Sequence, residues 1–205
     1  MLRCGTSYKM SELCKVYIMK RAVLGLGCLV LGGVFVWFAF VHKGNVVNDE
    51  TIHGACAAGN YELVQHLLQR GIGVDIRDGL DQTALLHAAW WGHEKVIELL
   101  LQRGADVNAK SELGFTALYW AVNHGQRPVI AMLLKAGAKA NIKSLNDWTA
   151  LHEAAVHGND DIYATLVAAG ADADATDRWG NTPREFKARS AAACAHAEHN
   201  RKNNG

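Results

Sequence analysis

The sequence lacks most of the features that mark an enzyme, a disulfide-stabilised scaffold or a nucleic-acid-binding protein. It contains no phosphate-binding loop, no H-E-x-x-H motif, and no nucleophile–base or paired-carboxylate arrangement. Its five cysteines lie far apart and form no C-x-x-C pair, so their spacing favours neither a disulfide framework nor a zinc site. The formal net charge is only +1, which argues against a general nucleic-acid binder. We therefore expect a protein that is not an enzyme.

Charge is nevertheless distributed unevenly along the chain. Residues 1–47 carry a formal charge of +5, and the remaining residues carry −4. A mildly acidic domain has no electrostatic reason to bind phosphate groups. Nucleic acid is therefore not expected among its partners.

One apolar stretch, Ala22 to Val41, runs for twenty residues without a charge, and basic residues lie on both sides of it. Twenty helical residues at about 1.5 Å each span the roughly 30 Å hydrocarbon core of a bilayer. The alternative is a buried core helix. The sequence predicts a basic segment at 1–21, a transmembrane anchor at 22–41 and a short polar linker at 42–47.

Retention of this anchor is favoured over cleavage. The apolar run exceeds the 7–15 residues of a signal-peptide core, and no small-x-small cleavage pattern follows it. Met19 stands directly before Lys20-Arg21 and the apolar run, as a natural start would. An alternative hypothesis is that the protein starts at Met19 and that residues 1–18 are an upstream extension of the deduced sequence.

The distribution of Lys and Arg predicts the orientation of the anchor. Five basic residues precede it and only Lys43 follows closely, and the side richer in Lys and Arg tends to stay cytoplasmic. We expect the rest of the chain to lie across the membrane, in the periplasm of a bacterium. The absence of any Asn-x-Ser/Thr acceptor fits a bacterial origin. A start at Met19 would reduce the bias to two against one.

The rest of the chain repeats itself every 33 residues. Thr83-Ala84-Leu85 recurs as Thr116-Ala117-Leu118 and Thr149-Ala150-Leu151, and in altered form as Thr182-Pro183-Arg184. Two glycine positions keep the same step: Gly71, Gly104, Gly137 and Gly170, and Gly59, Gly92, Gly125 and Gly158. A fixed period of this length is typical of repeat proteins in which each unit buries its apolar face against the next.

These motifs resemble those of the ankyrin-repeat family. The stretch Thr149 to Gly158 reads T-A-L-H-E-A-A-V-H-G, close to the family pattern T-P-L-H-x-A-A-x-x-G, and Gly104 to Ala109 reads G-A-D-V-N-A. The resemblance covers about residues 48–190. It implies an all-α repeat solenoid of helix-turn-helix units joined by β-hairpins. Its parts are repeats at about 48–79, 80–113, 114–145 and 146–178, a C-terminal capping helix at 179–199, and a tail at 200–205.

Several residues have specific structural expectations within this plan. Thr83 is placed to cap the first helix of repeat two, and Gly104 to end the second helix in the left-handed conformation. Pro128 falls in the first turn of a helix, where a missing N–H is tolerated. Cys56 replaces a packing alanine and is predicted to be a buried small hydrophobe. Repeat one, the most divergent, is predicted to be the N-terminal cap of the array.

In this family the partner binds to the hairpin tips and the concave face of the first helices. Five of the six tryptophans fall at such variable positions, and exposed tryptophan is typical of interaction hot spots. The alternative is that these rings pack on adjacent repeats or against the bilayer. Carried over position by position, the resemblance gives the candidate partner-binding residues His87, Trp90, Trp91, Glu112, Phe115, Trp120, His124, Trp148, Glu153, His157 and Trp179.

Ten histidines raise the question of metal or acid–base chemistry. His53 and His152 occupy the family position that hydrogen-bonds the turn, and His93 is the histidine of the family's G-H pair. A wider patch of His87, His124 and His157 could instead hold a metal or respond to pH. The trio Cys194, His196 and His199 could bind a metal weakly, although a polar tail explains it as well. No metal or other cofactor is expected.

Together these features predict a monomeric, membrane-anchored adaptor or scaffold that binds a partner protein through a concave aromatic face and the hairpin tips. Such a surface is preorganised, so little conformational entropy is lost on binding. The alternative is a periplasmic protein that binds a metal or haem through histidine. The sequence does not identify the partner.

Overall fold

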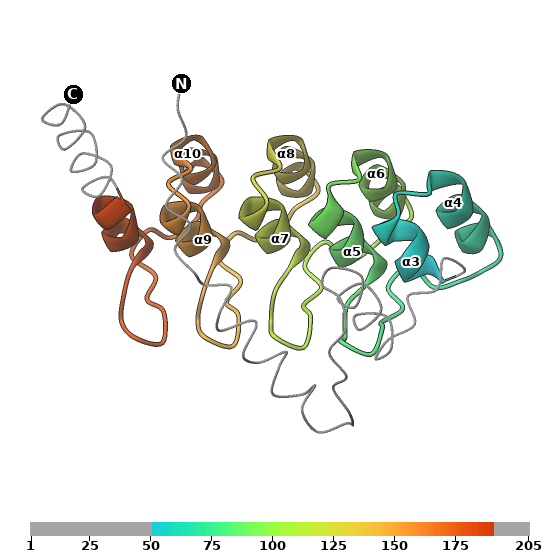
Figure 1. The fold of residues 1–205 in the computed structure, drawn as a ribbon, viewed down its shortest axis with the longest axis horizontal. Coiled ribbons are helices and arrows are strands. Elements are labelled where there is room, and N and C mark those ends of the chain that lie inside the picture. The colour runs from blue at the N-terminus through green and yellow to red at the C-terminus, as the bar shows by residue number, and fades with distance from the viewer. Residues whose placement is uncertain (1–50, 191–205) are drawn as a thin grey trace, which may run out of the picture. The chain divides into compact units, whose positions relative to one another are not determined.

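The computed structural model describes residues 51–190, which form a row of antiparallel helix pairs (Figure 1). The predicted membrane segment at 22–41, its flanking segments and the end of the capping helix lie outside these residues. The helices are α3 (Ile52–Ala57), α4 (Tyr61–Gln69), α5 (Ala84–Trp91), α6 (Glu94–Gln102), α7 (Ala117–Asn123), α8 (Arg127–Lys135), α9 (Ala150–Val156) and α10 (Asp160–Ala168). A further helix occupies 183–190. One pair lies in each predicted repeat, and no helix within 51–190 is long and apolar enough to cross a membrane.

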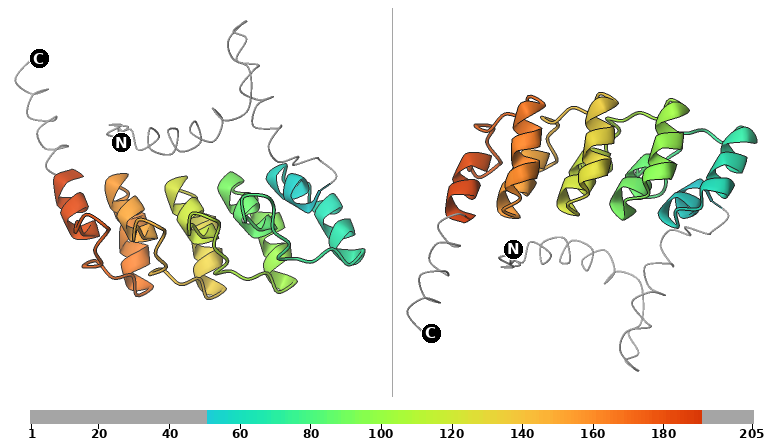
Figure 2. Two further views of the ribbon diagram at one scale, coloured as in Figure 1. Left: turned by 90° about the horizontal axis from the view of Figure 1, so that it is seen from below. Right: turned by 90° about the horizontal axis from the view of Figure 1, so that it is seen from above.

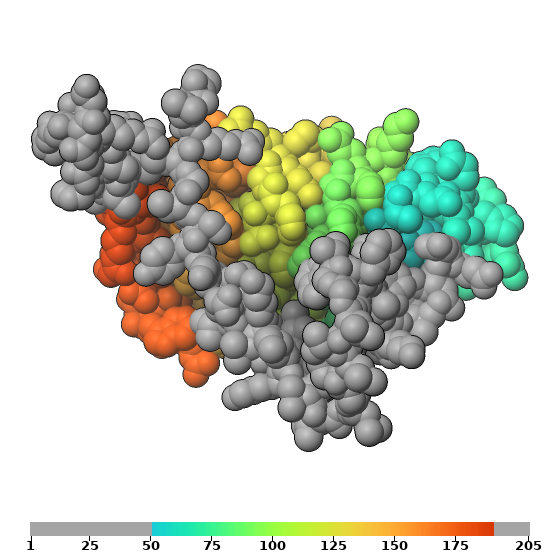
Figure 3. All heavy atoms as spheres, in the orientation of Figure 1, coloured from blue at the N-terminus to red at the C-terminus, as the bar shows by residue number. Residues whose placement is uncertain are grey.

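The first helix of each pair forms an inner row, and the second helix forms an outer row (Figure 2). Inner helices pack on one another along the array, α3 on α5, α5 on α7 and α7 on α9. Small residues make this close packing possible, because Ala88, Ala89, Ala121 and Ala154 are all buried at these contacts. The repeats follow one another in chain order along the array (Figure 3).

The outer helices are amphipathic. On α6 the predicted face is confirmed, since Val96, Leu99 and Leu100 are buried, while Glu94 and Glu98 are exposed. This is the spacing by which one face of a helix is removed from water. The outer row therefore closes the core on one side.

A threonine stands at the N-cap of each inner helix, but the hydroxyl groups do not all cap in the same way. Thr116 behaves as expected, because its hydroxyl accepts the N–H of Tyr119 at 3.3 Å. The prediction for the Thr83 hydroxyl is wrong: Thr83 stands at the N-cap, but its buried Oγ1 has no hydrogen-bond partner among the described residues. Only its backbone carbonyl serves the helix, by accepting the N–H of Leu86. In repeat one, the Thr51 hydroxyl caps α3 by accepting the N–H of Gly54. Thr51 stands one position later in its repeat than Thr83 and Thr116 do in theirs.

The predicted hairpins between repeats appear as paired loops, and within 51–190 no strand forms. A single isolated bridge joins Arg77 to Thr83. The tip residue lies at the same position of the repeat in every loop and has a positive φ. This φ is 58° at Asp81, 79° at Gly114, 58° at Asp147 and 80° at Gly180. The left-handed conformation is therefore a requirement of the loop, which two repeats meet with glycine and two with aspartate.

The loop tips are hydrogen-bonded to one another across repeats. Glu112 N–H donates to Leu80 O at 3.3 Å, Leu145 N–H to Leu113 O at 3.1 Å, and Arg178 N–H to Asn146 O at 3.0 Å. Each bond joins residues that are 32 positions apart. The tips therefore form one continuous edge of the array.

A second ladder follows the loop stems through long basic side chains. Arg77 donates to Lys110 O at 2.8 Å, Lys110 to Lys143 O at 3.2 Å, and Lys143 to Thr176 O at 3.2 Å. Every step is 33 residues, so each repeat uses a cation to satisfy a carbonyl of the next. These bonds fix the spacing of the loops.

Other local predictions are confirmed. Cys56 is fully buried, and burial raises the pKa of its thiol to about 12. Gly104 has a φ of 82° directly after α6, and Pro128 lies in the first turn of α8. Phe186, on the helix at 183–190, packs against the core, as a capping helix should. Residues 191–199 of that predicted helix lie outside the described part.

Gly114 should be the least replaceable loop glycine. A Cβ there would lie 2.9 Å from Ser144 Cα, whereas a Cβ at Gly104 would meet nothing within 4 Å, although both have a left-handed φ. We expect Gly104→Ala to lower the free energy of unfolding by about 1–2 kcal/mol, the cost of the conformation alone. Gly114→Ala should lower it by about 2–4 kcal/mol, because the backbone of the next loop must also move. Urea denaturation measures both, and equal losses would contradict the close approach.

Candidate partner-binding surface

The inner helices expose one face each, at the same positions of the repeat. On α5 the residues from Ala84 to Ala89 are buried except His87, which is half-buried. His87 shares a face with the exposed Trp90 and Trp91, because they lie three and four positions after it. The 33-residue step carries these positions to α7 and α9. We call the nine residues the inner-helix face: His87, Trp90, Trp91, Trp120, Asn123, His124, Glu153, Val156 and His157.

Aromatic rings cover this face from repeat two into repeat three. The Trp90 ring lies 4.0 Å from the Trp120 ring and 5.1 Å from the His124 ring, centroid to centroid. Phe115 extends the cluster from the preceding loop, 5.2 Å from Trp120 and stacked at 4.3 Å on Tyr119. The rings therefore pack across a repeat boundary, which holds them in fixed positions.

Two of these tryptophans still present much of their surface to water. Trp91 is 60% exposed and Trp90 is 36% exposed. Trp90 is held by its ring contacts and by Gln126, whose side-chain Nε2 donates to Trp90 O at 3.1 Å. Trp91 lies in the last turn of α5 and is the more exposed of the two. The indole N–H of Trp120 is buried and has no hydrogen-bond partner within the described residues.

Two other candidates, Trp148 and Glu153, are not available to a partner, because they are 6% and 3% exposed. The expectation of an exposed Trp148 at a hairpin tip is therefore corrected. Its ring stacks on His152 at 4.9 Å and meets Phe186 edge-on at 5.2 Å. Its indole Nε1 donates to Glu153 Oε2 at 2.9 Å. For this tryptophan the alternative holds, namely that the ring packs on its neighbours.

Glu153 is the centre of a buried network that joins repeats three and four. Tyr119 Oη donates to Glu153 Oε2 at 2.8 Å, and Asn123 Nδ2 donates to Oε1. His157 Nε2 donates to Oε1 at 2.9 Å. With Trp148, four donors therefore satisfy both carboxylate oxygens, which is what a buried carboxylate requires.

The network changes the acidity of both titratable members. Burial alone would raise the pKa of Glu153, but the hydrogen bonds from His157, Trp148, Tyr119 and Asn123 outweigh it and hold the pKa below its ordinary value. The hydrogen bond to the Glu153 carboxylate raises the pKa of His157. The charged pair is therefore favoured on folding.

A smaller cluster lies at the first repeat boundary. His87 Nε2 lies 2.9 Å from Asp78 Oδ2, and the His53 ring lies 5.6 Å from the His87 ring. Burial lowers the pKa of His53. Burial would raise the pKa of Asp78, but hydrogen bonds from His87, Gln82 and Leu80 bring it below its ordinary value. Asp78 thus fixes His87 at the edge of the inner-helix face.

The remaining candidates lie in the loops. Trp179 is 61% exposed at its tip, and the Arg178 guanidinium lies 5.6 Å from its ring centroid. Glu112 is exposed on an earlier tip, at the position that Arg178 occupies in the last one. Phe115 belongs to the aromatic cluster. Trp179 and Glu112 lie apart from that cluster, on the edge formed by the hairpin tips.

The structural roles predicted for three histidines are confirmed. Nε2 of His53 lies 2.8 Å from Ile76 O, that of His93 lies 2.9 Å from Ala57 O, and that of His152 lies 3.3 Å from Asn181 O. In residues 51–190 no three His, Cys, Asp or Glu side chains are grouped so that they could hold a metal ion. The trio Cys194, His196 and His199 lies outside these residues.

Three contributors were missed by sequence reasoning: Tyr119, Asn123 and Asp78. Tyr119 carries a usable signal, because it stands where the motif of repeat four has His152, and a departure at a framework position indicates a local need. Asn123 stands at the variable position that Trp90 occupies in repeat two, and its hydrogen bond to Glu153 gives no sequence signal. Asp78 gives no sequence signal for its bond to His87.

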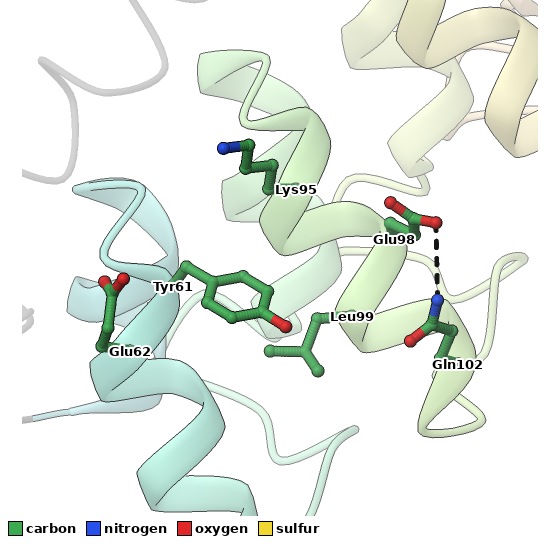
Figure 4. A pocket seen from close by; sticks show the side chains of 6 residues that line it. All are labelled: Tyr61, Glu62, Lys95, Glu98, Leu99 and Gln102. Carbon is green, nitrogen blue, oxygen red and sulfur yellow. Dashed lines mark hydrogen bonds between the residues drawn. The ribbon is translucent and has the colours of Figure 1, made fainter.

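On the outer side of the array, a hollow of about 470 Å³ lies between α4 and α6 (Figure 4). Leu99 and Tyr61 line it, together with residues of both charges such as Glu62 and Lys95. Its one close polar contact in Figure 4 joins Gln102 to Glu98 at 3.4 Å. These side chains do not converge on a common point, so the hollow is not a candidate site.

The Glu153 network predicts a large effect of a nearly isosteric change. In Glu153→Gln the side-chain NH₂ must face two of the four donors, so at least one hydrogen bond is replaced by a donor–donor contact. We expect the free energy of unfolding to fall by about 2–4 kcal/mol in urea denaturation. Glu62→Gln, on the exposed face of α4, is the matched control and should change it little. Wild-type stability in Glu153→Gln would contradict the network.

The His157–Glu153 pair predicts a stability contribution confined to one pH window. The lowered Glu153 pKa adds stability that is present above its unfolded value of 4.5 and is lost as the pH falls through the folded pKa. The raised His157 pKa adds stability that is present below 6.5 and is lost as the pH rises through the folded pKa.

The stability difference between the wild type and His157→Gln should therefore be largest between pH 4.5 and 6.5 and decline on both sides. Urea denaturation across this range measures it. His124→Gln, at the equivalent position, controls for loss of the ring, because His124 Nδ1 bonds to Trp120 O and not to a carboxylate. A difference that does not vary with pH would show that the pair is not charged in the folded protein.

Comparison with known proteins agrees with this architecture. The family model for ankyrin repeats in three copies matches residues 29–111, 52–144 and 109–177, and the overlapping matches together cover most of the chain. Comparison with curated proteins found no match. The all-helical repeats, the 33-residue step and the family match lead to one conclusion: the chain belongs to the ankyrin-repeat family.

Proposed function

We propose that this protein is a membrane-tethered adaptor that binds a partner protein through the aromatic part of its inner-helix face. Ankyrin repeats are generally protein–protein interaction modules and are typically not catalytic. We propose in addition that the protein is monomeric.

The exposure of Trp90 and Trp91 carries the proposal. A monomeric protein seldom leaves two adjacent tryptophans in water without a function, and tryptophan is the residue most enriched in binding hot spots. Both lie at the last turn of α5, where Trp120 and His124 support Trp90 from the next repeat. A partner would therefore meet rings that are already in position, which lowers the entropic cost of binding.

The buried N–H of Trp120 adds to this argument. An indole donor without an acceptor costs about 1–3 kcal/mol, so a native structure seldom keeps one without a reason. The Trp120 ring that carries it lies 4.0 Å from the Trp90 ring, centroid to centroid. A small shift of Trp90 on binding would allow a carbonyl of the partner to accept this hydrogen bond.

The tether rests on the sequence. The charge-free run at 22–41 is long enough to span a bilayer, and the excess of Lys and Arg before it favours a cytoplasmic N-terminus with the repeats on the other side. In a bacterium the repeats would lie in the periplasm. The partner would then be a protein of that compartment or of the membrane.

No observation in residues 51–190 favours the histidine-dependent metal or haem protein. His87 and His157 are each held by a carboxylate, and His124 by a backbone carbonyl of its own helix. A metal would have to break these hydrogen bonds and draw together side chains from different repeats.

Replacement of Trp91 should release the partner without disturbing the fold. Full-length protein with an affinity tag, solubilised from the membranes of the cells that make it, should retain a stoichiometric companion protein. Trp91→Ala should lose about nine-tenths or more of it, as expected for a hot-spot residue worth about 2 kcal/mol. Val167→Ala, an exposed apolar residue on the outer helix α10, is the matched control.

Circular dichroism should show unchanged helicity in both variants. A companion protein that is retained equally by Trp91→Ala and by the double change Trp90→Ala and Trp91→Ala would overturn the proposed binding surface. Loss with Val167→Ala as well would mean that the outer helices bind the partner.

A further inference from the structure

A second exposed apolar surface lies at the hairpin-tip edge, away from the aromatic cluster. Leu145 is 68% exposed and Leu80 is 48% exposed, and with Trp179 they place a large exposed apolar side chain on three of the four tips. Leu113 stands half-buried on the remaining tip. The backbone bonds between tips hold these side chains in one row. The row extends from repeat two to the last loop.

The chain enters the array on this same side. Thr51 caps α3 at the N-terminal end of an inner helix. At every later inner helix that end follows directly from a hairpin tip, as Thr83 follows the loop at Arg77–Thr83 (Figure 1). Whatever precedes residue 51 is therefore attached at the tip side of the array.

The length of the connection is short. Thr51 stands ten positions after Val41, the end of the predicted membrane segment. Even a fully extended chain advances only about 3.3–3.6 Å per residue, so Thr51 lies within about 36 Å of the bilayer. A tether of this length, attached at the tip side, brings the hairpin tips toward the membrane surface.

We propose that the hairpin-tip edge rests on the bilayer, with Leu80, Leu145 and Trp179 inserted among the lipid headgroups. This inference rests on the proposed membrane tether. Tryptophan favours the membrane–water interface, where its ring is partly apolar and its N–H meets polar groups. The array would then stand with its loops on the lipid and its helices pointing away from it.

The charge of the edge favours neutral lipid over anionic lipid. The basic residues of the stems and tips are Arg77, Lys110, Lys143 and Arg178, and the acidic residues are Asp78, Asp81, Glu112, Asp147 and Asp177. The balance is close to zero, and three of the four cations are engaged with backbone carbonyls. Apolar insertion into a zwitterionic phosphatidylcholine surface is therefore the interaction that fits.

This arrangement would leave the partner-binding surface free. Trp90 and Trp91 lie at the far end of α5 from the tip, and eight helical residues advance about 12 Å. The inner-helix face would then project from the membrane, at a fixed height and in a fixed orientation. A partner would be bound near the bilayer without competing with the lipid.

The test places a polarity-sensitive fluorophore on the tip edge of the full-length protein, reconstituted in phosphatidylcholine vesicles. The background carries Cys4→Ser, Cys14→Ser, Cys28→Ala and Cys194→Ser. Cys56 can stay, because it is fully buried and its thiol pKa of about 12 keeps it protonated and unreactive. Leu145→Cys receives the label, and Glu94→Cys, exposed at the start of α6, is the matched control.

The vesicles are first washed with alkaline carbonate, which removes proteins that are not anchored in the bilayer. We expect the protein to stay in the vesicles. We expect the emission at position 145 to be blue-shifted and to be quenched by doxyl-labelled lipid, and the emission at position 94 to be unaffected. Adding Leu80→Ser and Trp179→Ser should then abolish the blue shift and the quenching. Near-wild-type circular dichroism shows that these variants are folded.

Other results contradict the inference in distinguishable ways. Retention without quenching at position 145, or with equal quenching at both positions, would overturn the membrane contact and leave the tether standing. Quenching that survives Leu80→Ser and Trp179→Ser would show that the apolar tips do not cause it. A blue shift found only in native membranes would assign the edge to a protein. Release by carbonate would refute the tether and, with it, this inference.

Discussion

Every repeat of this protein must bury its apolar surface against its neighbours, because a helix pair of this size has no core of its own. The contacts between inner helices satisfy that need, and buried alanines such as Ala88 and Ala121 set how closely the helices approach. The same constraint imposes the 33-residue step. Positions that face the stack have to repeat, while those that face away are free to differ. Function is therefore expected at the positions that differ.

The packing is reinforced by polar links that follow the same step. Basic side chains join the loop stems, backbone bonds join the tips, and Glu153 ties repeat three to repeat four with four donors. Glu153 stands at the position that is His87 in repeat two and Trp120 in repeat three. The side chain at this one variable position is thus buried in repeat four, whereas in repeat three it belongs to the aromatic cluster. The aromatic surface is confined to repeats two and three for this reason.

Much of the fold follows from the sequence, because period, glycine placement and apolar spacing are local properties of the repeat. They predicted the helix pairs, the left-handed Gly104 and the buried Cys56. The failures have a different cause. Trp148 was expected on the surface, but its burial depends on Glu153 and on Phe186, which comes from a later segment. Thr83 stands at the N-cap as expected, but its hydroxyl makes no capping hydrogen bond. Pairings such as Asp78 with His87 also depend on the folded loop. The partner-binding residues themselves remain predictions.

The central claim is that recognition occurs on the inner-helix face while the outer helices serve the framework. A photo-crosslinking amino acid placed singly at Trp91, at His124 and at Val167, in living cells that make the full-length protein, tests it most directly. The account predicts one crosslinked protein, shared by positions 91 and 124 and absent from position 167 of the outer helix α10. A product obtained from position 167 and not from positions 91 and 124 would contradict it, because the partner would then lie on the opposite side of the array.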